Sequence, residues 1–124
     1  MKKLIKMVNH ELTENQKIQG AEIIELPKNL MSELKQCGSD ITALNALAND
    51  IIEFAKENSA EGFILPGGSP AFNSIFSTKI AGKFAQYFSH SVRDYKEVKN
   101  ADGSVSKTNV FRHVEWIIIT KEVV

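Results

Sequence analysis

The chain has 124 residues, of which 43% are hydrophobic and 24% charged, as expected for one globular domain that buries its own core. Its 15 basic and 15 acidic residues give a formal net charge of zero. This balance argues against a long nucleic acid as partner but allows a small phosphorylated ligand. The single cysteine, Cys37, excludes an intrachain disulfide and a cysteine-built zinc site. Because no apolar run approaches membrane-spanning length, we expect a cytoplasmic protein without a membrane partner.

Short apolar runs alternate with helical patterns in the first half of the chain. The spacing of Thr13 and Gln16 is that of a capping box at the start of a short helix. Apolar residues at i, i+3, i+4, i+7, i+8 and i+11 indicate a longer amphipathic helix. The elements predicted for this half are a strand over 4–8, a helix over 14–18, a strand over 21–26, and helices over 28–36 and 44–55.

A glycine turn follows the next apolar run. Residues 62–65 predict a buried strand, and Pro66-Gly67-Gly68-Ser69 comes directly after it. Ser69 suits the N-cap of a following helix and Pro70 suits its first position. The N-terminus of a helix favours anions, above all phosphate. The turn is therefore predicted to bind a ligand, although a purely structural turn would also use glycine for its backbone conformation.

The last third of the chain reads as all-β. Residues 84–88 predict a strand that ends at Ser89-His90, and a hairpin with strands over 92–98 and 105–119 follows. Residues 116–119 are apolar on both faces of their strand, which predicts an interior position in the sheet.

These elements predict one α/β domain over 1–124, with a doubly wound, mostly parallel sheet and an antiparallel C-terminal hairpin. Ligands of such sheets bind outside the carboxyl ends of the strands. Polar clusters follow three of the predicted strands: Asn9-His10, Pro66-Gly67-Gly68-Ser69 and Ser89-His90-Ser91. We therefore expect these clusters to meet in one site.

Histidines are the candidate catalytic residues of that site. His10 and His90 each follow a predicted strand, and an imidazole can bind phosphate as a cation or move a proton near neutral pH. Either could instead be an ordinary surface or core residue, and the serines and Asn9 could simply cap the chain after a strand. The candidate ligand-binding residues are Asn9, Gly67, Gly68, Ser69, Ser89, Ser91 and Arg93. The scattered histidines predict no metal site, and we expect no cofactor.

Two segments of the chain resemble a known family. They are Asn-His-Glu-Leu-Thr-Glu-Asn-Gln at 9–16, and Asp-Gly-Ser-Val at 102–105 continued by Asn-Val-Phe-Arg-His-Val at 109–114. They resemble the small stand-alone CRISPR-associated ring nucleases of type III systems, which begin with a strand ending in (Ser/Asn)-His-x-Leu-Thr-x-x-Gln. Some of these end with a glycine hairpin and a Phe-(Lys/Arg)-His-Val strand. The resemblance spans most of the chain outside 28–60, and Asn9 stands where Ser is commoner.

The resemblance implies a Rossmann-like, CARF-like domain that forms a homodimer and binds cyclic oligoadenylate, typically the tetra-adenylate ring, across the dimer axis. It also implies metal-independent cleavage, in which a ribose 2′-hydroxyl attacks the adjacent phosphodiester and leaves a 2′,3′-cyclic phosphate. On this reading Gly67, Gly68 and Ser69 grip phosphates. His10 is the first choice for catalysis and His90 the second. Asn9 and Ser89 would hold the reactive ribose or phosphate, and Arg93 would balance charge.

Three alternatives stay open at this point. The first is a protein that binds cyclic oligoadenylate without cutting it, as a sponge or sensor. The second is an interaction protein that oligomerises through the apolar strand 114–119. The third is a phosphoester enzyme with a linear substrate, which needs no two-fold symmetry. The roles of Arg112 and His113 are left unassigned.

Overall fold

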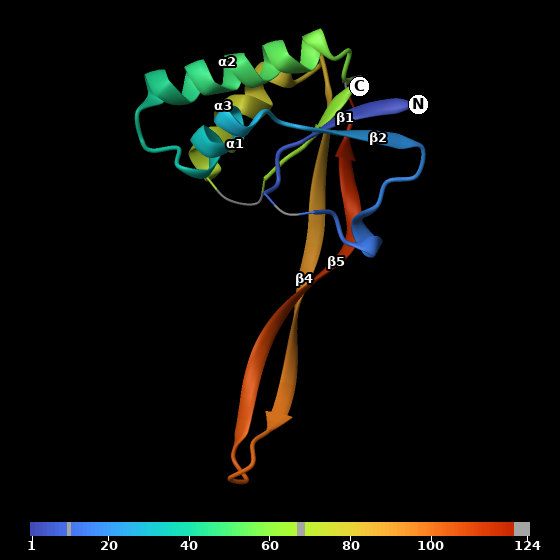
Figure 1. Ribbon diagram of the computed structural model, residues 1–124, viewed down its shortest axis with the longest axis vertical. Helices are drawn as coiled ribbons and strands as arrows, with labels where there is room; N and C mark the ends of the chain where they lie inside the picture. Colours follow the sequence, from blue (N-terminus) through green and yellow to red (C-terminus); the bar gives the residue numbers. More distant parts are fainter. Residues whose placement is uncertain (10, 67–68, 121–124) are drawn as a thin grey trace.

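The computed structural model describes residues 1–9, 11–66 and 69–120, without the side chains of 15, 93–96 and 109–111. The elements, labelled in Figure 1, are β1 (Lys2–Lys6), the 3₁₀ helix η1 (Glu14–Gln16), β2 (Ala21–Glu25), α1 (Lys28–Lys35), α2 (Ile41–Glu57), β3 (Gly62–Ile64), α3 (Pro70–Ile80), β4 (Ala85–Lys99) and β5 (Val105–Ile119). The predicted helix over 14–18 is only the three-residue η1. The amphipathic helix is longer than predicted, because the Asp40 side chain caps α2 by accepting a hydrogen bond from the Thr42 N–H at 3.0 Å.

The strands form one sheet in the order β2-β1-β3-β4-β5. Strands β1 to β4 run parallel to their neighbours, and β5 pairs antiparallel with β4. Helices α1, α2 and α3 cover one face of this sheet (Figure 1), whereas the connection from β1 to β2, which contains η1, packs on the other. The connections thus wind over both faces. The predicted Rossmann-like, doubly wound, mostly parallel sheet with an antiparallel C-terminal pair is confirmed.

The main core lies between the sheet and the three helices. Phe63 of β3 and Phe72 and Phe76 of α3 are each 0% exposed. The rings of Phe63 and Phe76 meet edge to face, with their centroids 4.8 Å apart. On the other face a smaller cluster forms around Leu4 and Tyr87. The first cluster supplies most of the apolar burial that holds the helices to the sheet.

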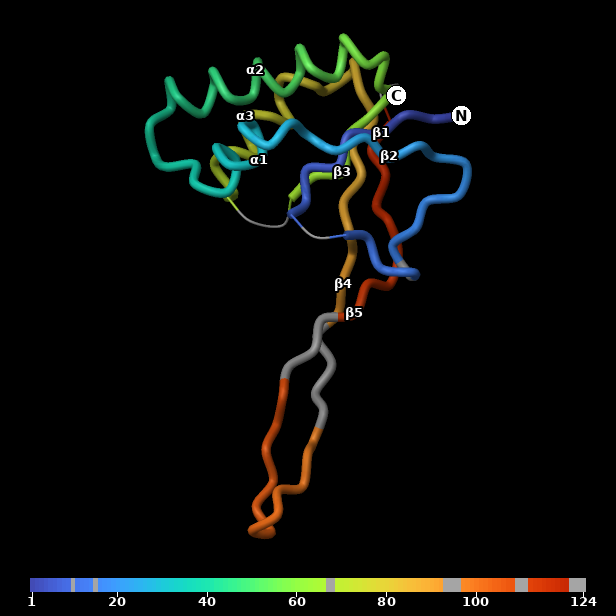
Figure 2. Tube along the Cα trace, in the orientation of Figure 1, coloured from blue at the N-terminus to red at the C-terminus, as the bar shows by residue number. Residues whose placement is uncertain are grey.

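Strands β4 and β5 continue far beyond the other strands. Figure 2 shows the pair extending away from the rest of the molecule, and we call residues 91–113 the arm. None of the side chains described in the arm is buried. The prediction that a strand ends at Ser89-His90 was wrong, because β4 runs unbroken from Ala85 to Lys99. Its pairing with β5 supplies backbone hydrogen bonds through these polar residues, so the strand does not need an apolar sequence to continue.

Strand β5 lies at the edge of the sheet, so the interior position predicted for residues 116–119 was also wrong. Ile117, Ile118 and Ile119 are 49%, 49% and 50% exposed. Apolar side chains on both faces of a strand are typical of an interior position, yet here only one backbone edge is paired. Within the part of the chain that the structure describes, no helix is long and apolar enough to cross a membrane.

Candidate functional site

The carboxyl ends of β1 and β3 form the switch point of the sheet. Strands β2 and β3 lie on either side of β1, and the connections that follow β1 and β2 cross opposite faces. In doubly wound sheets this point is where ligands bind. Asn9 follows β1, and Pro66 and Ser69 follow β3; all three line one pocket of about 200 Å³. The structure therefore brings together two of the predicted ligand-binding residues, Asn9 and Ser69. His10, Gly67 and Gly68 lie outside the described residues.

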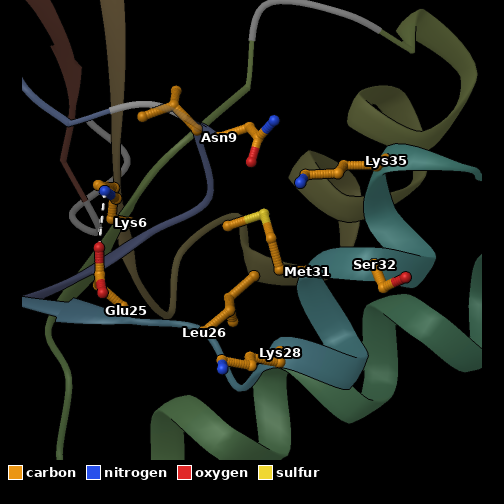
Figure 3. A pocket seen from close by; sticks show the side chains of 9 residues that line it. Lys6, Asn9, Glu25, Leu26, Lys28, Met31, Ser32 and Lys35 are labelled. Atoms are coloured by element: carbon orange, nitrogen blue, oxygen red, sulfur yellow. Dashed lines mark hydrogen bonds and ion pairs between the residues drawn. The ribbon is translucent and has the colours of Figure 1, made fainter.

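A second pocket, of about 300 Å³, adjoins the first and shares Asn9 with it. It is shown in Figure 3, where the amide of Asn9 and the ammonium of Lys35 point toward each other across the opening. The further lining residues are Lys6, Val8, Glu25, Leu26, Lys28, Met31 and Ser32. Three lysines thus face a hollow at the carboxyl end of the sheet, and their charge suits an anionic ligand.

One of these lysines is already paired. Lys6 is only 6% exposed, and its Nζ donates a hydrogen bond to Glu25 Oε1 at 2.9 Å. This hydrogen bond and the charge of the ammonium hold the pKa of Glu25 below its ordinary value. The cations on the helix side of the pocket are Lys28 and Lys35, one at each end of α1.

Sequence reasoning missed these lysines. Lys28 comes directly after Pro27, three residues past the end of β2, so the rule used for the polar clusters could have found it. Lys35 reaches the pocket only because of how α1 packs on the sheet. A single sequence carries no local signal for that approach.

Ser69 is the N-cap of α3 by position, but its side chain makes no capping hydrogen bond among the described residues. The predicted N-cap position is confirmed, but the Ser69 side chain does not cap the helix. The reason is conformational: Ser69 has φ 54° and ψ 68°, whereas a capping residue needs an extended backbone. Its Oγ instead accepts a hydrogen bond from Cys37 Sγ at 3.2 Å. A left-handed conformation at a residue other than glycine costs roughly 1–2 kcal/mol, and such positions cluster at functional sites.

The remaining predicted residues lie along β4. Ser89 and Ser91 face away from the helices and join His113 and Trp116 of β5 in what we call the His113 cluster. His90 is exposed, and strand alternation places it on the helix side with Phe88, opposite Glu115 of β5. Arg93 belongs to β4, but its side chain lies outside the described part. Among the described residues, Asn9 and Ser69 thus share a pocket at the switch point, and Ser89 and Ser91 meet His113.

No group of three or more His, Cys, Asp and Glu side chains among the described residues is arranged to hold a metal ion. The arrangement offers cationic and hydrogen-bonding groups at the switch point and an imidazole at the base of the arm. These groups can bind phosphate and transfer protons.

The chain belongs to the family described as the uncharacterized protein MJ1673 family, whose model matches residues 2–117. No curated protein and no solved structure gave a significant match. The matched range runs from β1 into β5 and contains the switch-point pockets as well as the His113 cluster.

Proposed function

We propose that this protein is a ring nuclease that binds cyclic oligoadenylate, in particular the tetra-adenylate ring, and cuts it without a metal to end type III CRISPR signalling. The observation that carries the proposal is the meeting of Asn9 and Ser69 at the switch point, beside Lys28 and Lys35. The ligand class comes from the resemblance of segments 9–16 and 102–114 to ring nucleases.

Local charge supports a phosphate-bearing ligand despite a net charge of zero. Each phosphodiester of the ring carries one negative charge, and Lys28 and Lys35 both line the pocket that would receive it, with the Lys35 ammonium directed at Asn9 in Figure 3. The N-terminus of α3, at Pro70, follows the glycine turn and adds the positive end of a helix dipole. Asn9 offers an amide to a ribose or phosphate oxygen at the same place.

The proposed reaction needs positioning and charge stabilisation more than covalent chemistry. A ribose 2′-oxygen attacks the adjacent phosphorus, the bond from phosphorus to the 5′-oxygen breaks, and a 2′,3′-cyclic phosphate remains. A cleft that aligns the 2′-hydroxyl and stabilises the developing charge can supply much of this barrier. The segment at 9–16 includes His10, the family-like candidate for proton transfer, and His90 is the second candidate.

A homodimer in the cytoplasm is part of the same proposal. The half-exposed Ile117, Ile118 and Ile119 on an edge strand support it, because such edges are normally covered or charged. A ring of four identical nucleotides can lie on the two-fold axis of such a pair. We expect Ile118→Asp to sediment as a monomer at concentrations at which the unmodified chain sediments as a dimer. A monomeric unmodified chain would contradict this part of the proposal.

The first test is to incubate the protein with labelled cyclic tetra-adenylate in excess EDTA and to separate products by chromatography. We expect linear products bearing a 2′,3′-cyclic phosphate. Lys35→Ala should weaken binding about tenfold or more, because a charge-assisted hydrogen bond to phosphate is worth about 1.5–3 kcal/mol. Lys56→Ala, on the exposed end of α2, is the matched control and should bind as the unmodified chain does.

The outcomes separate the alternatives. Intact ring that co-elutes with the protein would replace cleavage by sequestration. Binding that Lys35→Ala and Asn9→Ala leave unchanged would move the site away from the switch point. Failure to bind the ring at all would overturn the proposal. It would favour the alternative of an interaction protein that oligomerises through the apolar edge strand.

A further inference from the structure

A local irregularity in the sheet aims His113 at Ser89 and Ser91. Strand β4 pairs with β5 as Ser89↔Trp116 and His90↔Glu115, but the next pair is Ser91↔His113. A regular antiparallel ladder would place Val114 opposite Ser91, with His113 on the other face. The extra residue on β5 is a β-bulge, a feature that re-aims side chains and is common next to active sites.

The side chains of this cluster form a hydrogen-bonded chain. Ser89 Oγ is bonded to His113 Nδ1 and, at 3.1 Å, to Ser91 Oγ. A serine hydroxyl has only one proton to donate. When that proton points to Ser91, Ser89 Oγ accepts the proton on Nδ1 of His113. The lone pair of the imidazole is then on Nε2, because one nitrogen's hydrogen bond decides the state of the other.

The indole of Trp116 packs against the imidazole of His113. The two ring centroids are 4.9 Å apart, and the indole N–H donates to the Gln16 carbonyl at 3.1 Å. Tyr87 meets Trp116 edge to face, with centroids 6.3 Å apart. Gln16 ends the segment that begins at Asn9 in the switch-point pocket, so one stretch of chain links the pocket to the His113 cluster. The partly exposed indole is also a surface on which a base can stack.

We propose that His113 is a catalytic residue of the ring cleavage and that its Nε2 takes the proton from the attacking ribose 2′-hydroxyl. This inference rests on the proposed function. The 2′-oxygen forms its bond to phosphorus as the proton moves to Nε2, the bond to the 5′-oxygen breaks, and the resulting imidazolium returns the proton to that oxygen. Ser89 is a positioning residue that holds Nδ1–H. His10 and His90 would then serve binding and not proton transfer.

The first part of the test uses the protein without ligand. In ¹⁵N-labelled protein, histidine nitrogen shifts should show that neutral His113 carries its proton on Nδ1, and Ser89→Ala should shift the population toward the Nε2–H form. A dominant Nε2–H form in the unmodified protein would overturn the assignment, whatever the protein binds.

The second part measures single-turnover cleavage of cyclic tetra-adenylate beside its binding affinity. His113→Asn keeps a side-chain amide that can bond to Ser89 but has no base. We expect its cleavage rate to fall about 100-fold or more with little change in affinity. Added imidazole should restore part of the rate of His113→Ala. Ser89→Ala should lower the rate about tenfold at unchanged affinity, without rescue. Glu115→Gln, a neighbour on β5, is the control and should cleave normally.

These outcomes separate the inference from the function on which it rests. Cleavage by His113→Asn at the unmodified rate, or its loss in His90→Asn alone, would overturn the role of His113 and leave the ring nuclease standing. If circular dichroism shows that His113→Asn is misfolded, the test of the role of His113 is the rescue of His113→Ala by added imidazole. Lack of rescue would then count against the inference. Absence of cleavage by the unmodified protein would overturn both.

Discussion

The helix-covered face of the sheet and the arm are held together in different ways. On the helix-covered face Phe63, Phe72 and Phe76 are completely removed from water. In the arm, no described side chain is buried, and two strands pair with each other alone. A two-stranded hairpin without a third strand or a packed face is marginally stable in water. The stability of the molecule therefore resides in its body, while the arm depends on its backbone ladder and its attachment.

The difference between the packed body and the exposed arm explains where the candidate functional side chains lie. Asn9 and Ser69 lie at the carboxyl edge of the body, and His113 lies at the base of the arm. Side chains at this border are anchored by the core on one side and exposed on the other. They can be substituted without removing the apolar contacts that fold the chain. Because the candidate site residues are separate from the core, a substitution can change function without unfolding the chain. Four predictions test this difference between the body and the arm.

The largest expected effect is the loss of a core ring. Phe76→Ala removes a side chain that is 0% exposed and packs edge to face on Phe63, and it should lower the free energy of unfolding by about 3–5 kcal/mol in urea titrations. Val105→Ala, at the start of β5 and 57% exposed, is the control. It should cost less than about 0.5 kcal/mol. A comparable loss in both variants would show that the arm is packed against something in solution.

The close contact between β3 and the start of β4 should be the next most sensitive place. A Cβ added at Gly62 would lie 2.7 Å from the Ala85 carbonyl oxygen and 3.0 Å from the Ala85 Cβ, where β3 meets β4. Gly62→Ala should therefore cost about 1–3 kcal/mol of unfolding free energy through overpacking. Around Gly38 no described atom lies within 4 Å of an added Cβ. Gly38→Ala should cost nothing or stabilise slightly, and a similar loss there would contradict the steric explanation.

Most of the body was predictable from the sequence because its signals are local. The periodicity of α2 and the proline at the first position of α3 are signals in neighbouring residues. The course of β4 through Ser89 and Ser91 was not predictable in this way. It is decided by pairing with β5, whose residues are distant in the chain. The edge position of Ile117–Ile119 was not predicted for the same reason. Apolar residues on both faces of a strand do not show how many neighbouring strands it has.

The residues of the candidate site also fall into two groups, those predictable from local sequence and those placed by contacts between distant segments. Asn9 and Ser69 could be predicted because each follows a strand directly, which is a property of the sequence. Lys35 enters the pocket through the packing of a helix, and His113 turns toward Ser89 through a bulge. Both depend on contacts between distant segments. The residues that sequence reasoning missed are thus those placed by tertiary structure.

A smaller, local effect is expected at the tip of the arm. Gly103 has φ 88° in the turn between β4 and β5, and alanine there should cost about 1 kcal/mol. Because the arm is not packed on the body, this cost should appear as about fivefold faster amide exchange within the arm. The global unfolding midpoint should not change. Gly103→Asn should have a weaker effect, since asparagine tolerates this conformation. A fall in the global midpoint would mean that arm and body unfold as one unit.

The smallest effect is expected from Glu25, which sits at the pocket edge with its side chain 71% exposed while its partner Lys6 is buried. The pKa of Glu25 lies below its ordinary value of 4.5 because Lys6 donates a hydrogen bond to it and attracts its charge. A lowered carboxyl pKa contributes stability that is present above the unfolded-state value and is lost as pH falls through the folded-state value. The unmodified chain should therefore be more stable than Glu25→Gln near neutral pH, and the difference should shrink as the pH falls below the ordinary carboxyl value of 4.5. Urea titrations of both proteins across this range measure it. A difference that does not vary with pH would show that Lys6 and Glu25 are not paired in solution, and Lys6 would then be available to an anionic ligand.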